Sequence, residues 1–149
     1  MKQYTRQQTS LLMVQQRRGI DKDTKALRFQ AYERIVLLCE RIKLGELVLR
    51  LNNPSLDPKA LRNIMLVSIQ KEYEHNLTQQ LYVSGQLWEM VELLKEQTIN
   101  HVTSSYIEHR DDDLPIYVQD LINKGQLLNK NIGSTVISAV RKEVELYFS

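Results

Sequence analysis

One pair of residues has the spacing that helical metal enzymes use. Glu72 and His75 form a Glu-x-x-His segment, which places a carboxylate and an imidazole on the same face of a helix. Di-iron helical bundles use this segment twice and add two carboxylates from other helices. Here it occurs once, because neither His101 nor His109 follows a Glu by three residues. A polar rim or a hydrogen bond between helices therefore explains the pair better, and a metal-binding site at Glu72 and His75 is the alternative.

The chain around this pair is rich in polar side chains that hydrophobic packing does not explain. Side chains of these types can form a buried hydrogen-bond network between helices. The candidates for such a network are Glu74, His75, Asn76, Gln79 and Gln80.

Other residues whose side chains could take part in catalysis or metal binding have structural explanations. Cys39 is the only cysteine, which excludes an internal disulfide, and it lies on an apolar stripe where a thiol is inert. The acidic run 111–113 lacks the alternating spacing of a calcium loop and suits the start of a helix. Serine-nucleophile, phosphate-loop and dinucleotide motifs are missing. The sequence therefore predicts no catalytic residue, no cofactor and no small-molecule substrate.

The elements that carry these residues are predicted to be helices. Apolar residues recur with a period near 3.6, and the 149 residues include only five Gly and three Pro. Asp57 followed by Pro58, and Ser84, have the types expected at the N-caps of two helices. The fold class is all-α: one domain over residues 25–149, a bundle of about five helices with short polar connections. The expected helices cover residues 24–44, 58–82, 85–108, 113–124 and 134–147.

Repeated apolar positions predict the buried face of each helix. In the first helix these are Leu27, Ala31, Ile35, Leu38 and Ile42. In the second they include Leu61, Met65, Ile69, Tyr73, Leu77 and Leu81. Gly125 is expected to interrupt or end the fourth helix.

An apolar cluster follows the first predicted helix and is larger than a linker needs. It consists of Leu47, Val48, Leu49 and Leu51. These residues are candidates for contact with a partner protein, and burial under the bundle is the alternative.

The first 24 residues differ from the rest of the chain. They hold five basic and two acidic residues and a single apolar cluster, residues 11–14. We expect a basic arm that is partly disordered or docks on something else. Basic residues can follow the phosphates of nucleic acid or of anionic lipid. A net charge of +2 for the whole chain does not favour nucleic acid, whereas peripheral contact with a membrane stays open.

Three stretches resemble a family of uncharacterised bacterial helical proteins of the Bacteroidetes type. They are the Leu-Arg-Phe-Gln-Ala-Tyr-Glu-Arg segment within residues 27–42, the Glu-Tyr-Glu-His-Asn-Leu-Thr-Gln-Gln segment within 72–84, and Trp88 with the helix that follows. The similarity covers residues 25–149. Many members begin with one membrane-spanning helix, and residues 1–24 here hold no such segment. The resemblance implies an architecture and no mechanism.

Together these features favour a non-catalytic helical domain that acts by contact with a protein partner or with itself. We expect it in the cytoplasm, or at the cytoplasmic face of the inner membrane. The alternatives are a metal-binding protein or enzyme with its site near Glu72 and His75, and an adaptor that contacts membrane or nucleic acid through the basic arm.

Overall fold

The computed structural model describes residues 2–148, without the side chains of residues 2–5 and 16–21. The described chain contains helices and no strand, which confirms the all-α prediction. Where about five helices were expected, the described residues form six α-helices, because the segment after the first is a helix of its own. The elements are α1 (Lys2–Arg41), α2 (Leu44–Leu51), α3 (Pro58–His75), η1 (Leu77–Leu81), α4 (Gly85–His109), α5 (Leu114–Leu128), η2 (Asn129–Gly133) and α6 (Ser134–Phe148).

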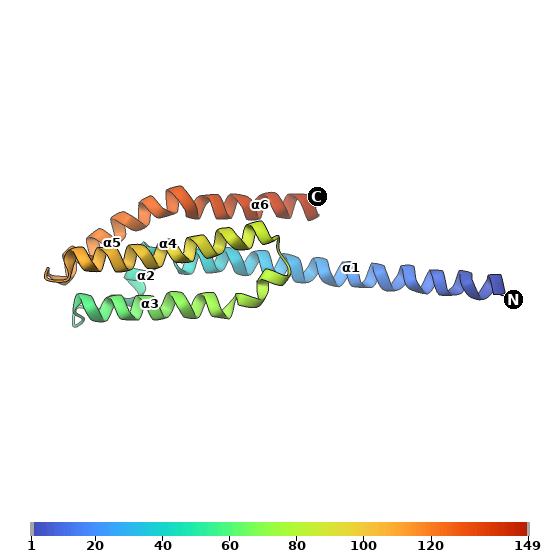
Figure 1. Cartoon of the computed structure of the whole chain (residues 1–149), viewed down its shortest axis with the longest axis horizontal. Helices are drawn as coiled ribbons and strands as arrows, with labels where there is room; N and C mark the ends of the chain where they lie inside the picture. The colour runs from blue at the N-terminus through green and yellow to red at the C-terminus, as the bar shows by residue number, and fades with distance from the viewer. Residues whose placement is uncertain (1, 149) are drawn as a thin grey trace.

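The first helix is much longer than the sequence pattern predicted. α1 runs without a break through residue 24, where we expected it to begin, and its N-terminal half projects away from the bundle (Figure 1). A helix that is already nucleated extends at little cost, and no Pro lies between residues 2 and 41 to stop it. The buried part of α1 therefore continues as helix into the arm.

The core lies between the C-terminal half of α1 and the other helices. Of the predicted stripe of α1, the side chains from Ala31 onward are buried, whereas Leu27 is 42% exposed. The prediction for Leu27 was wrong because α1 enters the bundle only after this residue. Phe29 is also exposed, although its ring packs edge-on against Phe148 of α6, with the centroids 5.6 Å apart.

The second predicted helix ends seven residues early. α3 stops at His75, and Asn76 leaves the helical region with φ −114° and ψ 8°. The Asn76 side chain donates to the carbonyl of Glu72 at 2.8 Å, so it replaces part of the helix hydrogen bonding. The chain then turns through η1, and Leu77 and Leu81 are exposed rather than buried as predicted.

Two predicted helix starts are confirmed. Asp57 accepts a hydrogen bond from the backbone N–H of Ala60 at 2.8 Å, with Pro58 in the first turn of α3. Ser84 accepts from the backbone N–H of Leu87 at 3.0 Å. Both caps satisfy an amide that the helix itself leaves unpaired.

Gly125 lies inside α5 and is buried, which contradicts the prediction that it ends the helix. A Cβ at this position would lie 2.7 Å from the Cβ of Leu44 in α2. The glycine therefore permits a close crossing of α2 and α5. The backbone of α5 continues to Leu128 because one Gly costs a helix only about 1 kcal/mol.

Candidate functional site

The Glu72 and His75 pair lies on the surface of α3, and its carboxylate is already engaged. The Nε–H of Arg41 donates to Oε1 of Glu72 at 2.5 Å, which links α3 to the end of α1. His75 is exposed at the last residue of α3. The structure does not bring another carboxylate or imidazole of the described residues to this pair in a three-ligand group. The arrangement fits an ion pair between helices.

The predicted polar network around His75 is reduced to one buried residue. Asn76 is 7% exposed, accepts from Nε of Arg34 at 3.3 Å and so ties the end of α3 to α1. Glu74 and Gln80 are exposed and bond within their own segments. Gln79 is half-buried. These residues do not converge on a common centre.

The apolar cluster after α1 belongs mainly to the core. Leu47 and Val48 are fully buried on the inner face of α2, and Leu51 is half-buried against the core. Only Leu49, 73% exposed, points to solvent. Of the two roles that the sequence left open, burial therefore applies to Leu47 and Val48.

A cluster of charged residues joins the end of α4 to α5. His109 donates through Nδ1 to Asp112 at 2.8 Å, and its Nε2 lies 3.3 Å from a carboxylate oxygen of Asp120. Glu108, His109 and Asp120 are the described residues whose ligand atoms approach one another within 4.8 Å. The Lys124 ammonium lies 3.1 Å from Asp120 and 3.3 Å from Glu108, so a cation already offsets part of the negative charge of this cluster.

The pKa values in this cluster follow from its hydrogen bonds. The hydrogen bond to Asp112 raises the pKa of His109, helped by the charges of Asp120 and Glu108. Partial burial opposes ionisation of Asp120, but hydrogen bonds from Ser105 and Lys124 outweigh it and lower the pKa of that carboxyl. The cluster is therefore a network of ion pairs that closes the turn between α4 and α5. The sequence drew attention to His109 and to the acidic run 111–113 in this cluster, but it gave no signal for Asp120.

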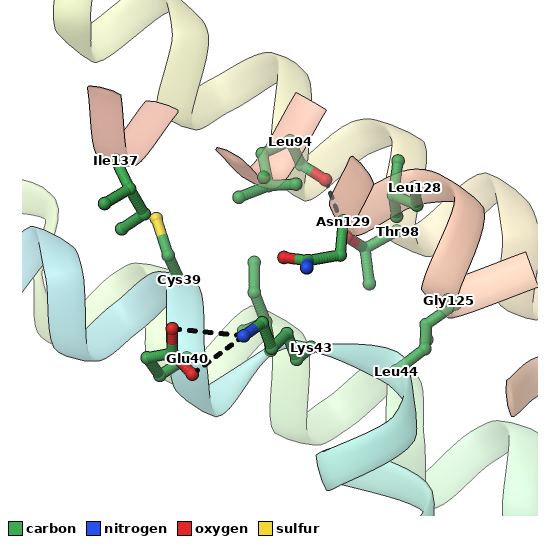
Figure 2. A pocket seen from close by; sticks show the side chains of 12 residues that line it. Cys39, Glu40, Lys43, Leu44, Leu94, Thr98, Gly125, Leu128, Asn129 and Ile137 are labelled. Atoms are coloured by element: carbon green, nitrogen blue, oxygen red, sulfur yellow. Dashed lines mark hydrogen bonds and ion pairs between the residues drawn. The ribbon is translucent and has the colours of Figure 1, made fainter. Parts of the chain in front are cut away.

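A small cavity lies beside Cys39, where α1, α4 and the η2 turn meet. Figure 2 shows the Cys39 sulfur facing Ile137, with the Asn129 amide reaching into the space. The cavity measures about 20 Å³, which is enough for a single water molecule. Burial raises the pKa of the Cys39 thiol to about 12, so the thiolate that would act as nucleophile is suppressed. The predicted burial of Cys39 is confirmed.

Glu143 of α6 forms the polar node that the sequence did not reveal. Its carboxylate accepts from the hydroxyl of Tyr32 at 2.8 Å and from both the hydroxyl and the backbone N–H of Ser84. Burial, reinforced by this carboxylate, raises the pKa of Tyr32. The node fastens α6 to α1 and to the N-cap of α4. Since Tyr32 and Glu143 lie 111 residues apart, no local pattern predicts their contact.

The arm, residues 1–24, is the least covered part of the described chain. Every described side chain of residues 6–15 is exposed. These include the four apolar residues of one helical turn, which are exposed by 63%, 60%, 57% and 45% from Leu11 to Val14. The side chains of Lys2, Arg17 and Arg18 lie outside the described set, whereas Arg6 and Lys22 are described and exposed. Across the described residues, no helix is both long enough and apolar enough to cross a membrane.

A helical bundle with a projecting helix is the class of structure that these observations define. Residues 1–147 match the model of a family of unknown function, DUF7935, so the chain belongs to this family. The match includes the arm as well as the bundle, and it confirms that the chain comes from an uncharacterised family. No curated protein and no solved structure is significantly similar to the chain.

Proposed function

We propose that this chain is a non-catalytic interaction protein whose arm binds a protein partner. The observation that carries the proposal is the exposed apolar turn from Leu11 to Val14 on a helix that projects from the bundle (Figure 1). The family match over residues 1–147 supports it, because the matched region includes the arm.

The energetics of the arm favour a bound state. A helix in water gains most of its stability from packing of an apolar face, and a segment without such packing is marginal. Burial of apolar surface releases about 25 cal/mol per Å². Those side chains of residues 11–14 that face the partner would contribute this energy when it covers them.

The bundle supports a structural role rather than a chemical one. Two of the polar residues singled out from the sequence form contacts between helices: Glu72 with Arg41, and Asn76 with Arg34. The cavity beside Cys39 is too small for a substrate. The bundle therefore serves to hold α1 and to orient the arm.

Site-specific photo-crosslinking in the cells that make the protein tests this proposal. A photoreactive phenylalanine analogue would replace Met13, which is 57% exposed on the arm. The matched control carries it at Val67, which is 53% exposed on α3. We expect an adduct with a protein from position 13 and none from position 67. Absence of a protein adduct from position 13, with the variant present at normal level, would overturn the proposal.

A further inference from the structure

The outward face of α4 carries negative charge without an exposed positive residue. Nine residues of α4 are exposed, and none is Lys or Arg. Glu108 pairs with Lys124, but Glu89 and Glu96 form no ion pair with a described cation. The face also holds two exposed apolar side chains, Leu93 at 46% and Ile107 at 60%. The nine residues are Gly85, Gln86, Glu89, Leu93, Glu96, Asn100, Ser104, Ile107 and Glu108.

We propose that the partner of the arm is a second copy of this chain. In the resulting two-fold dimer, the arm of each copy lies antiparallel along the exposed face of α4 of the other copy. This inference rests on the proposed function and names the partner that the arm binds.

Charge complementarity is the first argument for this pairing. The arm has five basic and two acidic residues, and residues 25–149 have 15 basic and 16 acidic ones. The positive charge of the chain is therefore concentrated in the arm. The face of α4 is the opposite case, with its three exposed Glu and no exposed cation. Charges of opposite sign steer the two surfaces together and fix their orientation.

The lengths of the two elements also agree. The arm extends for about 35 Å at 1.5 Å per residue, and the 25 residues of α4 extend for about 37 Å. The arm cannot reach α4 of its own chain, because α1 is one continuous helix that points away from the bundle (Figure 1). The complementary face must therefore come from another molecule.

The direction of the helices gives the register. α1 and α4 run in the same direction within the bundle (Figure 1), so a two-fold axis perpendicular to these helices makes the arm of one copy antiparallel to α4 of the other. Along the common axis, Lys22 then lies level with Glu89, and Arg6 lies level with residue 105. The apolar turn at residues 11–14 lies level with residues 97–100, one to two turns from Leu93.

The contact area is that of a stable dimer. Each arm covers a strip of about 35 Å by about 10 Å. Since each copy contributes both an arm and an α4 face, about 700 Å² per partner is covered. A standard interface buries about 800 Å² per partner.

The composition of the arm favours a protein surface over nucleic acid or lipid. The phosphates of nucleic acid attract basic side chains but form no favourable contact with the four consecutive apolar residues of the arm. A lipid surface requires an apolar stripe along the whole helix, whereas the apolar residues of 6–15 are confined to one turn. A helix face with both carboxylates and apolar side chains can pair with the basic residues of the arm and also contact its apolar turn.

The test uses the whole chain and measures its mass in solution by sedimentation and native mass spectrometry. We expect a dimer at about 0.05 M salt that weakens about tenfold or more at about 0.5 M, because exposed charge pairs are screened. One variant reverses the arm, Arg6→Glu with Lys22→Glu. A second reverses the face, Glu89→Lys with Glu96→Lys. Each variant alone should be monomeric, because its arm and its α4 face then carry charge of the same sign.

Mixing the two variants gives the decisive result. In the mixed pair, the reversed arm meets the reversed face, and the normal arm meets the normal face, so the dimer should return. Lys59→Glu with Lys71→Glu on α3, and Glu33→Lys with Glu145→Lys, make the same charge changes at exposed positions elsewhere. These controls should leave the dimer intact. Circular dichroism checks that every variant is folded.

Each result separates this inference from the proposed function. A dimer that both reversals disrupt and the mixture restores supports the arm-on-α4 contact. The inference is overturned if the wild-type chain is monomeric at both salt concentrations. It is also overturned if both charge-reversed variants remain dimeric. If the chain is monomeric and binds anionic vesicles or DNA instead, the proposal that its partner is a second copy is likewise overturned. The proposed function survives these outcomes only if position 13 still crosslinks to a different protein.

Discussion

The two halves of α1 are one helix, but different forces hold them. From Ala31 to Arg41 one face of the helix is buried in the core, and Tyr32, Ile35 and Leu38 are each 2% exposed or less. In residues 6–15 every side chain is exposed. The comparison shows that helix formation and helix burial are separate events: local hydrogen bonds form the helix, whereas distant residues decide which part of it is covered.

The largest predicted effect comes from removing matched side chains in the two halves. Ile35→Ala should lower the free energy of unfolding by about 3 kcal/mol, because it opens a cavity at a fully buried position. Leu12→Ala removes a side chain that is 60% exposed and should change this free energy by less than about 0.5 kcal/mol. Urea denaturation followed by circular dichroism, at about 0.5 M salt to suppress association, measures both. Equal losses would contradict the contrast between the two halves.

A smaller effect compares two glycines of the α2–α5 crossing. Gly125→Ala should lower the free energy of unfolding by about 1–2 kcal/mol, because the new Cβ meets the Cβ of Leu44 at 2.7 Å. At Gly45 nothing lies within 4 Å of an added Cβ. Gly45→Ala should therefore raise the free energy by up to about 1 kcal/mol through better helix propensity. The same urea titration gives both values, and stabilisation by Gly125→Ala would show that α2 can withdraw freely from α5.

The smallest effect concerns the ion pairs at the far end of α4. The pKa of His109 is raised above its ordinary value of 6.5 by the hydrogen bond to Asp112. Protonated His109 therefore stabilises the fold below about pH 6.5, and this contribution is lost as the pH rises through the raised pKa. Thermal unfolding should show that His109→Gln lowers the melting temperature slightly at about pH 5.5 and not at about pH 8.5. A deficit of equal size at both values would mean that the charge of His109 is not the cause.

Much of the bundle follows from local sequence. The N-caps at Asp57 and Ser84 need only a side-chain oxygen and an amide three residues on, so they are visible in the sequence. The stripe from Ala31 to Ile42 repeats every three or four residues, and it is buried as predicted. The same pattern failed at Leu27, which precedes the part of α1 that enters the bundle, and at Leu77, which follows the end of α3.

The candidate sites were harder to predict because they depend on distant partners. The sequence singled out Glu72 and His75 from their spacing, but the partner of Glu72 is Arg41 of α1. It did not indicate Glu143, whose partners Tyr32 and Ser84 lie 111 and 59 residues away. The spacing of residues within one helix shows which face of that helix a residue occupies. It does not show which residue of another helix contacts it.

Local sequence is enough to specify that the chain is helical, where α3 and α4 begin, and that the positive charge is concentrated in the first residues. These properties depend on contacts within about four residues, which the order of side chains specifies directly. Long-range packing decides where α1 leaves the bundle, that Gly125 lies beneath α2, and that the acidic residues of α4 face solvent together. Each of these depends on how helices far apart in the chain pack against one another, since packing selects which faces are covered and which are left for a partner.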